Sequence, residues 1–324
     1  MTDTPLTYQS DETAAKADFT ITQEFTRENI ELKTVYTNAY SNDDILNLNV
    51  KTDAATGNVI TPNVADVHRV RIGYTKVSDA GTFEIKLNDG TTIAAAAVND
   101  SNYQPGDDEA AFNAATGEIL LGENVYKQLY ASDGFSFTYR KDNFAKGDLN
   151  PVMYYDCVDN NPDNAGVVYT KKTEDIEYNI NFSQKLKVNT EANEVFNMYL
   201  GRDIDDLITS VNNVIDIEAQ LEKVEGMLKQ DIYSDKDSQS KLNSIKEGLT
   251  KQNELAKEEM KNRFEYCVGT MQGYQEQASL AKADAGNRMT RLNLTKSRLT
   301  EQKTNFTNLK SENEDIDLEE VVVG

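Results

Sequence analysis

The chain has 324 residues, of which 38% are hydrophobic and 8% aromatic, and it contains no tryptophan. This supply of core side chains fits two or three thin domains better than one large compact core. The 33 basic and 55 acidic residues give a net charge of −22, and we expect no Lys/Arg cluster to interrupt this acidity. The balance argues against nucleic acid and against an anionic membrane surface as partners, because both require a basic footprint.

The N-terminal sequence MTDTPLTYQSDETAAKADF has neither a basic n-region nor an apolar h-region, so no cleaved secretory signal is predicted. The longest apolar run, IAAAAV at 93–98, is much shorter than the ~20 residues of a membrane-spanning helix. We therefore expect a soluble protein that is either cytoplasmic or exported without signal cleavage.

Residues 1–28 are polar and weakly helical, and we assign them to a short N-terminal segment of a helical rod. Residues 29–188 contain all but one of the prolines and most of the aromatic side chains, and they alternate with a period of two, which predicts a mainly antiparallel β-domain. The clearest hairpin is TFEIKLNDGTTIAAAA, with Asn88-Asp89-Gly90 as its turn. The other expected strands are IELKTVY, DILNLNV, VHRVRIGYTKV, EILLG, FSFTYRK, VMYYDCV, GVVYTKK and DIEYNINFSQKLKVN, with a helix near ENVYKQLYA.

Residues 189–324 have no proline and a helical period, which predicts an α-helical rod domain. Ile204, Leu207 and Val211 begin one amphipathic stripe, which ends near 228. The segment YSDKDSQS interrupts it, and either Ser234 or Asp235 could cap the second helix, which we expect to end near 280.

A last helix places Leu292, Leu299 and Phe306 seven residues apart, with Leu309 at an intermediate position. This narrow stripe is typical of coiled-coil-like packing. Regular helix is expected to end near Asn313, where the sequence turns acidic. The predicted fold class is therefore α+β, with an antiparallel β-domain and an elongated, coiled-coil-like helical rod.

Candidate catalytic groups are few. His68, the single histidine, lies inside a predicted strand and is interpreted as an ordinary strand residue rather than a general base. Adjacent carboxylates such as Asp205-Asp206 do not face each other on a helix and are interpreted as solvated. The Asp/Asn-rich loops at 235–246 and 159–166 do not match a calcium-binding loop. With no nucleotide, zinc or hydrolase motif, we predict no enzyme, no cofactor and no metal site.

The two cysteines, Cys157 and Cys267, are 110 positions apart in neither a CxxC nor a metal-ligand spacing. We interpret both as small buried hydrophobic residues rather than as a disulfide.

The C-terminal segment AKADAGNRMTRLNLTKSRLTEQKTNFTNLKSENEDIDLEEV resembles the C-terminal rod segment of the flagellin superfamily. The matching positions include Gly286, Asn287, Arg288 and Asn305. The acidic end, SENEDIDLEEV, is similar to the hook-associated protein 3 family, whose segment reads S-x-x-E-D-x-D-L-x-E, rather than to flagellins. The run KLKVNTEANEVFN, followed by GRDIDDLITSVNNV, also resembles a strand-to-helix junction of that family.

The resemblance implies a structural component of the bacterial flagellum at the hook-filament junction, extracellular and exported without a cleaved signal peptide. Implied partners are the first hook-associated protein, flagellin, neighbouring copies of the chain and an export chaperone. It also implies a central fragment without the terminal helices of the family, which should be monomeric in isolation. Packing or interface roles would fall on a set of rod residues: Ile204, Leu207, Val211, Asn287, Arg288, Leu292, Leu299, Phe306 and Leu309.

Three alternatives remain open. Flagellin or a flagellin-like filament protein differs mainly in the acidic end and in the 203–285 region. A surface adhesin with a helical stalk would place a glycan or protein ligand on residues 30–185. An enzyme would depend on His68.

Overall fold

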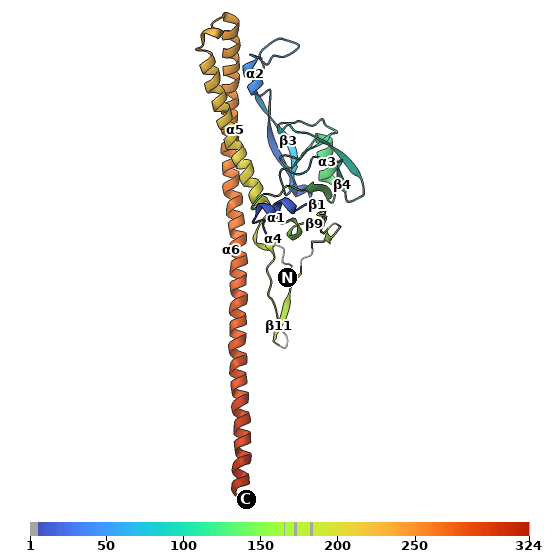
Figure 1. Ribbon diagram of the computed structural model, residues 1–324, viewed down its shortest axis with the longest axis vertical. Helices are drawn as coiled ribbons and strands as arrows, with labels where there is room; N and C mark the ends of the chain where they lie inside the picture. Colours follow the sequence, from blue (N-terminus) through green and yellow to red (C-terminus); the bar gives the residue numbers. More distant parts are fainter. Residues whose placement is uncertain (1–5, 165, 172–173, 182–183, 324) are drawn as a thin grey trace. The chain divides into compact units, whose positions relative to one another are not determined.

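The computed structural model describes residues 6–164, 166–171, 174–181 and 184–323, and its chain divides into two compact units. The first unit combines residues 1–171 with 198–272, and the second combines 172–197 with 273–324. Both units contain strands and helices, so the protein is α+β (Figure 1).

Among the described residues of the first unit, ten strands form one sheet in the order β10-β9-β1-β8-β4-β5-β6-β7-β3-β2. Neighbouring strands are antiparallel except β5 and β6, which are parallel. The strands are β1 (Phe19–Phe25), β2 (Ile30–Thr37), β3 (Asn63–Arg71), β4 (Phe83–Leu87), β5 (Thr92–Ala97), β6 (Ala110–Asn113), β7 (Glu118–Leu121), β8 (Phe135–Lys141), β9 (Asp156–Asp159) and β10 (Val168–Tyr169).

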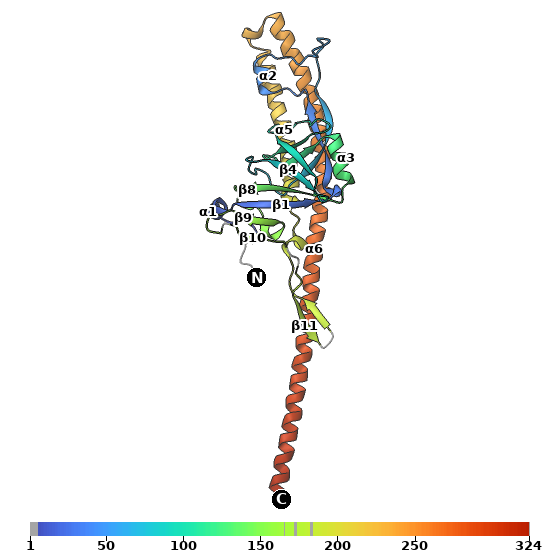
Figure 2. The ribbon, with the colours of Figure 1, turned by 90° about the vertical axis from the view of Figure 1, so that its right-hand side faces the viewer.

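Strand β1 corrects the assignment of residues 1–28 to the rod. Its sequence FTITQEF alternates, so that Phe19, Ile21 and Phe25 are buried on one face while the intervening residues are more exposed. It pairs with β8 on one side and β9 on the other, inside the sheet (Figure 2). A short helix, α1 (Asp11–Lys16), precedes it. The period of two in 19–25 was the available signal for this strand.

The segment 44–50 was predicted as a strand, and this prediction is wrong. Residues 42–46 form the short helix α2 (Asn42–Leu46), because Ser41 caps it: the Ser41 hydroxyl accepts from the Asp44 amide, while the Asp44 carboxylate accepts from the Ser41 amide. The predicted hairpin at 83–97 and the predicted helix, α3 (Glu123–Ala131), are confirmed.

Aromatic side chains form the centre of the sheet's core. Phe83, Phe112 and Phe137 contact one another, with ring centroids 4.6 to 6.1 Å apart, and Leu129 of α3 is fully buried in the same cluster. Cys157 is buried in the same cluster, and Cys267 is buried on a helix; both thiols are free. The interpretation of both cysteines as buried residues is confirmed.

A helical hairpin completes the first unit. Helix α5 (Tyr199–Met227) lies beside the first part of α6 (Lys236–Val323), after the 3-10 turn η3 (Asp231–Tyr233) (Figure 1). The Asp235 carboxylate accepts from the Ser238 amide at 2.9 Å and caps α6. The hairpin has its own core, formed by Val214, Ile217, Val224, Met227, Leu242, Ile245, Leu249 and Ala256.

Tyr40 and Ile45, from the segment that contains α2, pack into the hairpin core. The ring of Tyr40 lies against Gly248, where a Cβ would come within 2.2 Å of a ring carbon. The Tyr40 amide also donates to the Gln252 side chain at 2.9 Å. A glycine in the middle of a helix costs about 1 kcal/mol in helix propensity, and here it lets the β-rich segment approach the helix backbone.

Helix α6 is a single helix of 88 residues, so the predicted break near 280 is wrong. The predicted end of helix near Asn313 is also wrong, since the helical backbone continues to Val323. Neither position contains proline, the residue that most strongly ends a helix, and Arg288, Met289, Arg291 and Leu292 after Gly286 favour its continuation.

The second unit consists of the β11 (Glu177–Asn181) and β12 (Gln184–Lys187) hairpin, the short helix α4 (Ala192–Val195) and α6 from Gly273 onward. The Gln277 side chain donates to the Asn193 and Glu194 carbonyls, and the Arg288 guanidinium donates to the Asn189 carbonyl. These bonds attach the segment that follows β12 to α6.

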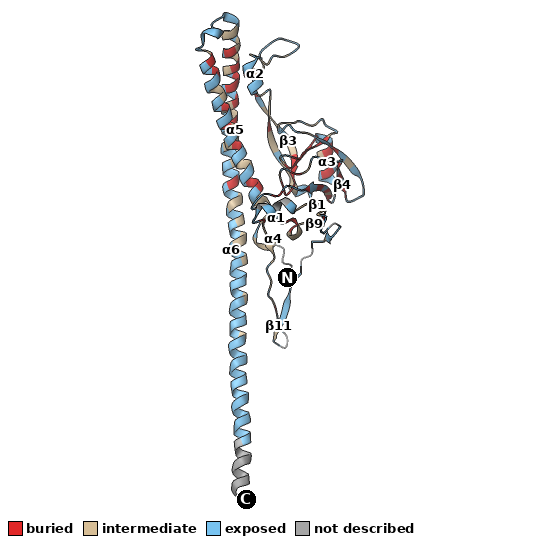
Figure 3. Ribbon diagram, in the orientation of Figure 1, coloured by how far each residue is buried: buried red, intermediate tan, exposed pale blue. Residues whose placement is uncertain are grey.

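Beyond this attachment, every residue of α6 up to Glu314 except Thr295 is exposed (Figure 3). Leu299 is 54% exposed and Phe306 is 73% exposed. The seam residues that were predicted to pack therefore face solvent in this chain.

We expect Leu249→Ala to lower the free energy of unfolding by about 2 to 5 kcal/mol, because Leu249 is fully buried in the hairpin core. Leu299→Ala should change it by less than about 0.5 kcal/mol, since half of that side chain is already exposed. Urea unfolding followed by circular dichroism measures both variants. Equal losses would contradict the assignment of the hairpin as the stabilising core.

Candidate functional site

A network of charged side chains joins the sheet to α5. Strand β3 contributes Arg69 and Arg71, which share one face of the strand because they are two residues apart. Both are almost fully buried, with exposed fractions of 2% and 6%. Two buried guanidinium groups require anionic partners, since desolvation of an unpaired charge costs several kcal/mol.

Helix α5 supplies the partners from one side. An Nη atom of Arg69 lies 2.8 Å from the Asp206 carboxylate, and an Nη atom of Arg71 lies 2.7 Å from Asp203. Asp203 and Asp206 are three residues apart, so they face the same direction on the helix. The pairing therefore ties the first turns of α5 to β3.

The sheet supplies the partners from the other side. Glu118 of β7 pairs with Arg69 and, at 2.7 Å, with the Lys33 ammonium of β2. Glu31 of β2 pairs with Arg71. The Glu118 carboxylate also accepts from the Thr116 hydroxyl at 2.8 Å. Three neighbouring strands, β2, β3 and β7, thus share one network.

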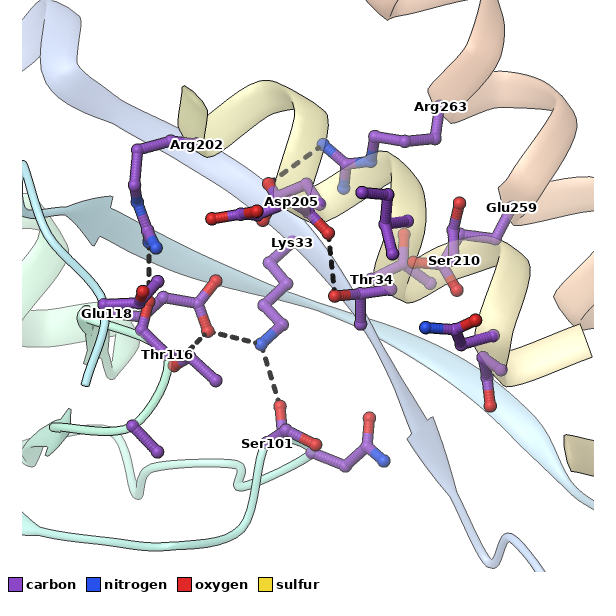
Figure 4. Close-up of a pocket in the computed structure, with 18 of the residues that line it drawn as sticks. Lys33, Thr34, Ser101, Thr116, Glu118, Arg202, Asp205, Ser210, Glu259 and Arg263 are labelled. Atoms are coloured by element: carbon purple, nitrogen blue, oxygen red, sulfur yellow. Dashed lines mark hydrogen bonds and ion pairs between the residues drawn. The ribbon is translucent and has the colours of Figure 1, made fainter. Parts of the chain in front are cut away.

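Arg202 extends the network at the start of α5. It is 4% exposed, and its Nη2 donates to the Thr116 carbonyl at 2.6 Å (Figure 4). Its Nε and that of Arg69 have no hydrogen-bond partner among the described residues. Arg263 of α6 lies 3.7 Å from Asp206, so α6 also contacts the network.

The titration of the carboxylates follows from this arrangement. Burial alone would raise the pKa of Glu118, but the charges of Lys33 and Arg69 outweigh it and hold the pKa below its ordinary value of 4.5. Arg69 and Arg71 likewise outweigh burial at Asp206 and hold its pKa below 3.8. Both groups are therefore charged at neutral pH and stabilise the folded state there.

A groove of about 560 Å³ borders the network. Lys33 and Thr34 of β2 line one wall, together with Ser101 of the loop after β5 (Figure 4). Ile208, Asn212 and Asp216 of α5 line the other wall. One wall of the groove is therefore formed by a strand and a loop, and the other by α5.

The groove residues are already engaged in structural contacts. The Lys33 ammonium is bound by Glu118 and by the Ser101 carbonyl at 2.8 Å, and the Ser210 hydroxyl donates to the Leu207 carbonyl at 2.7 Å. The arrangement is suited to holding the sheet against α5 and to presenting a surface along the helix.

His68 lies on the opposite face of β3 from the two arginines. Its ring stacks on Tyr126 of α3 with centroids 3.5 Å apart, and its Nδ1 lies 3.9 Å from the Glu123 carboxylate. Within the described residues, no group of three or more His, Cys, Asp or Glu side chains is arranged to hold a metal ion.

A second hollow, of about 510 Å³, lies elsewhere in the first unit, beside β1 and β9. Glu24, Asp133 and Asp156 line it together with Tyr154. Tyr154 is 5% exposed, and its hydroxyl has no hydrogen-bond partner in the described structure.

The predicted interface residues separate into two sets, each within its own unit. Ile204, Leu207 and Val211 lie on α5, where Ile204 is 42% exposed and the other two are half-buried. On α6, Asn287 is exposed and Arg288 is half-buried, pairing with Asp284. Leu292, Leu299, Phe306 and Leu309 are exposed on the same helix.

Sequence reasoning missed the ion-pair network. Asp205-Asp206 was interpreted as a solvated pair, and for Asp206 this is wrong, because its side chain is only 17% exposed. The signal was present in VHRVRI, where two arginines occupy alternate positions of an otherwise apolar strand. Their partners on α5 are more than 130 positions away and carried no comparable signal.

Comparison of the chain with models of protein families, with curated protein sequences and with solved structures gives no match. None of the described helices combines the length and the apolar character that crossing a membrane requires.

We expect Arg69→Met to cost about 3 to 5 kcal/mol of stability, because it leaves Glu118 and Asp206 buried with too few counter-charges. The control is Arg140→Met, which removes an ion pair with Asp18 at a half-exposed arginine and should cost about 1 kcal/mol or less. Urea unfolding at neutral pH compares the two. Similar losses would show that the network is not a stabilising contact.

The free energy of unfolding should also fall as pH decreases through the folded-state pKa values of Glu118 and Asp206. Both values are lowered on folding, so their stabilisation is complete above the unfolded values and is lost as the pH falls from these to the folded ones. In Asp206→Asn, the loss of stability between about pH 5 and pH 2 should be smaller than in the wild type. An unchanged pH dependence in this variant would argue against a depressed pKa at Asp206.

Proposed function

We propose that the chain is a structural, non-enzymatic subunit of the bacterial flagellum at the hook-filament junction, where it links hook-associated proteins to flagellin. One observation carries the proposal: α6 continues from Gly273 to Glu314 with its apolar seam exposed. This segment alone is roughly 60 Å long at 1.5 Å per residue. The same helix, α6, contains the C-terminal sequence at 281–321 that resembles the hook-associated protein 3 family.

An exposed seam of this length favours an assembly role. Helical stability in proteins comes mainly from packing of an amphipathic face, and leaving several large apolar side chains in water is unfavourable. Leu292, Leu299, Phe306 and Leu309 would be covered when other helices pack along α6. Subunits of a helical junction would supply such partners.

The first unit fits the same role as a rigid attachment. The network around Arg69 and Arg71 fixes a β-rich body to a helical hairpin at several points. Its charged groups form ion pairs with one another, as expected of a contact that holds the sheet and the helices together under mechanical force. By resemblance, the partners would be the first hook-associated protein, flagellin, neighbouring copies and an export chaperone, outside the cell.

Deleting the gene from its source organism tests this function. We expect cells that still assemble hooks, release unpolymerised flagellin into the medium and fail to swim in soft agar, because filaments lack their attachment. Electron microscopy and detection of flagellin in the culture medium are the measurements. A plasmid copy of the complete gene should restore filaments.

The same experiment separates the proposal from flagellin itself. Deletion of a flagellin gene would remove flagellin from the medium as well as from the cell surface. Normal filaments and motility after deletion would contradict both structural roles.

A second candidate is a surface adhesin, favoured by the hollow beside β1 and β9. Its carboxylates and the partnerless Tyr154 hydroxyl are groups that hydrogen-bond a polyhydroxylated ligand. A glycan array probed with the purified chain tests this candidate. Binding that Asp156→Asn reduces would support it, whereas a silent array would count against it.

A further inference from the structure

The exposed stripe of α6 contains lysines as well as apolar residues. Its members follow one another at steps of three and four, which places them on one face of the helix. We call this stripe the lysine seam: Met289, Leu292, Lys296, Leu299, Lys303, Phe306 and Lys310. All seven are exposed. Leu292, Leu299 and Phe306, seven residues apart, form an apolar row along the helix. The neighbouring row has the same spacing and consists of Met289 followed by Lys296, Lys303 and Lys310.

The segment around the seam reverses the charge of the rest of the chain. Residues 288–310 contain six Lys/Arg and a single carboxylate, Glu301, for a net charge of +5. Because the whole chain has a charge of −22, the remainder has −22 − 5 = −27. The expectation that no basic cluster interrupts the acidity is therefore wrong. The composition of the whole chain masked this cluster.

The central lysines of the seam are available for a partner. Arg288 pairs with Asp284 and Lys310 with Glu314, whereas Lys296 and Lys303 form no ion pair with any described residue. Away from the seam, the helix has the charged residues Arg291, Arg298 and Glu301 together with uncharged ones such as Ser297, Thr304 and Asn308. A partner on the seam face must therefore offer carboxylates beside an apolar stripe.

Helix α5 presents such a stripe on the first unit. Ile204, Ile208 and Ile215 are four and seven residues apart and are 42%, 51% and 55% exposed. Glu222 continues the stripe seven residues after Ile215, and Asp216 lines the groove together with Ile208. Both carboxylates are exposed. The helical period, the apolar residues and the sign of the charges complement the lysine seam.

We propose that the lysine seam of one copy packs along the exposed α5 stripe of a second copy, with Lys296 and Lys303 facing the carboxylates of that stripe. The two surfaces differ, so the contact is heterologous and repeats from copy to copy into a ring or an open chain. The inference rests on the proposed structural role and specifies how neighbouring copies recognise each other. A second copy is favoured over other acidic proteins because the chain itself supplies both complementary stripes.

The contact is weak for an isolated pair of copies. Its ion pairs are solvent-exposed and are screened by salt, so a monomer is expected in dilute solution at physiological ionic strength. Neighbours held together at high local concentration would form it readily. The measurement is therefore made at high protein concentration and low ionic strength.

Sedimentation velocity of the full chain tests the proposal. The wild type should associate at low salt and dissociate as salt is added. Lys296→Gln/Lys303→Gln/Lys310→Gln should weaken association by about tenfold or more, since each exposed ion pair contributes modestly. Ser297→Glu/Thr304→Glu/Asn308→Glu is the matched control: it also changes the net charge by three units, but on the opposite face, and should weaken association much less.

A charge exchange tests the acceptor. Lys296→Glu/Lys303→Glu alone and Asp216→Lys/Glu222→Lys alone should each fail to associate, because like charges then face each other. A mixture of the two should associate, because each has a surface that complements the other. Circular dichroism establishes that both variants are folded.

Two outcomes would overturn the proposal. A wild type that stays monomeric at low salt and high concentration would show that the seam has another partner. Normal association of Asp216→Lys/Glu222→Lys would exclude α5 as the acceptor and indicate contact between two seams. The deletion phenotype is independent of these results: association without a motility defect would remove the flagellar role and leave the contact standing.

Discussion

The pairing of two buried arginines with two aspartates of α5 is the contact on which the first unit depends. Arg69 and Arg71 are almost fully buried, so β3 can occupy its place only when α5 supplies Asp203 and Asp206. An apolar contact of the same size would allow the helix to slide along the sheet by a turn. Charged groups that must each find a partner fix the register between sheet and helix, at a cost in desolvation that apolar packing would avoid.

That contact also determines what α5 can offer elsewhere. With Asp203 and Asp206 directed at the sheet, the helical period leaves Ile204, Ile208 and Ile215 exposed. These isoleucines are not explained by the core of the hairpin, which uses Val214, Ile217 and Val224 instead. The helix therefore has three functional faces: one for ion pairs to the sheet, one for the hairpin core, and one that has no partner in the described structure of a single copy.

The parts of the fold that follow from local sequence were predictable, and those that follow from distant contacts were not. The 83–97 hairpin is determined by a two-residue period and an Asn-Asp-Gly turn, and α3 by a helical period over nine residues. The sequence of strand β1 alternates just as clearly, but the polar residues on either side of it led to its assignment to the helical rod. The network could not be assembled from sequence, because its members come from β2, β3, β7 and α5, and only the folded sheet brings Glu31 and Glu118 to the same arginine.

For the predicted interface residues, the sequence pattern was visible, but their exposure in the folded chain was not. Leu292, Leu299 and Phe306 were recognised as one stripe from their spacing, yet spacing alone does not distinguish a buried seam from an exposed one. In the folded chain the stripe is exposed, and lysines lie between its apolar residues. A partner must therefore match both the apolar side chains and the positive charges. A seam of leucines alone would pack against almost any apolar helix, whereas one that alternates with lysines rejects partners without facing carboxylates. In a strongly acidic protein, such a seam favours contact with an acidic helix of another copy and weakens contact between two seams, whose lysines would repel each other.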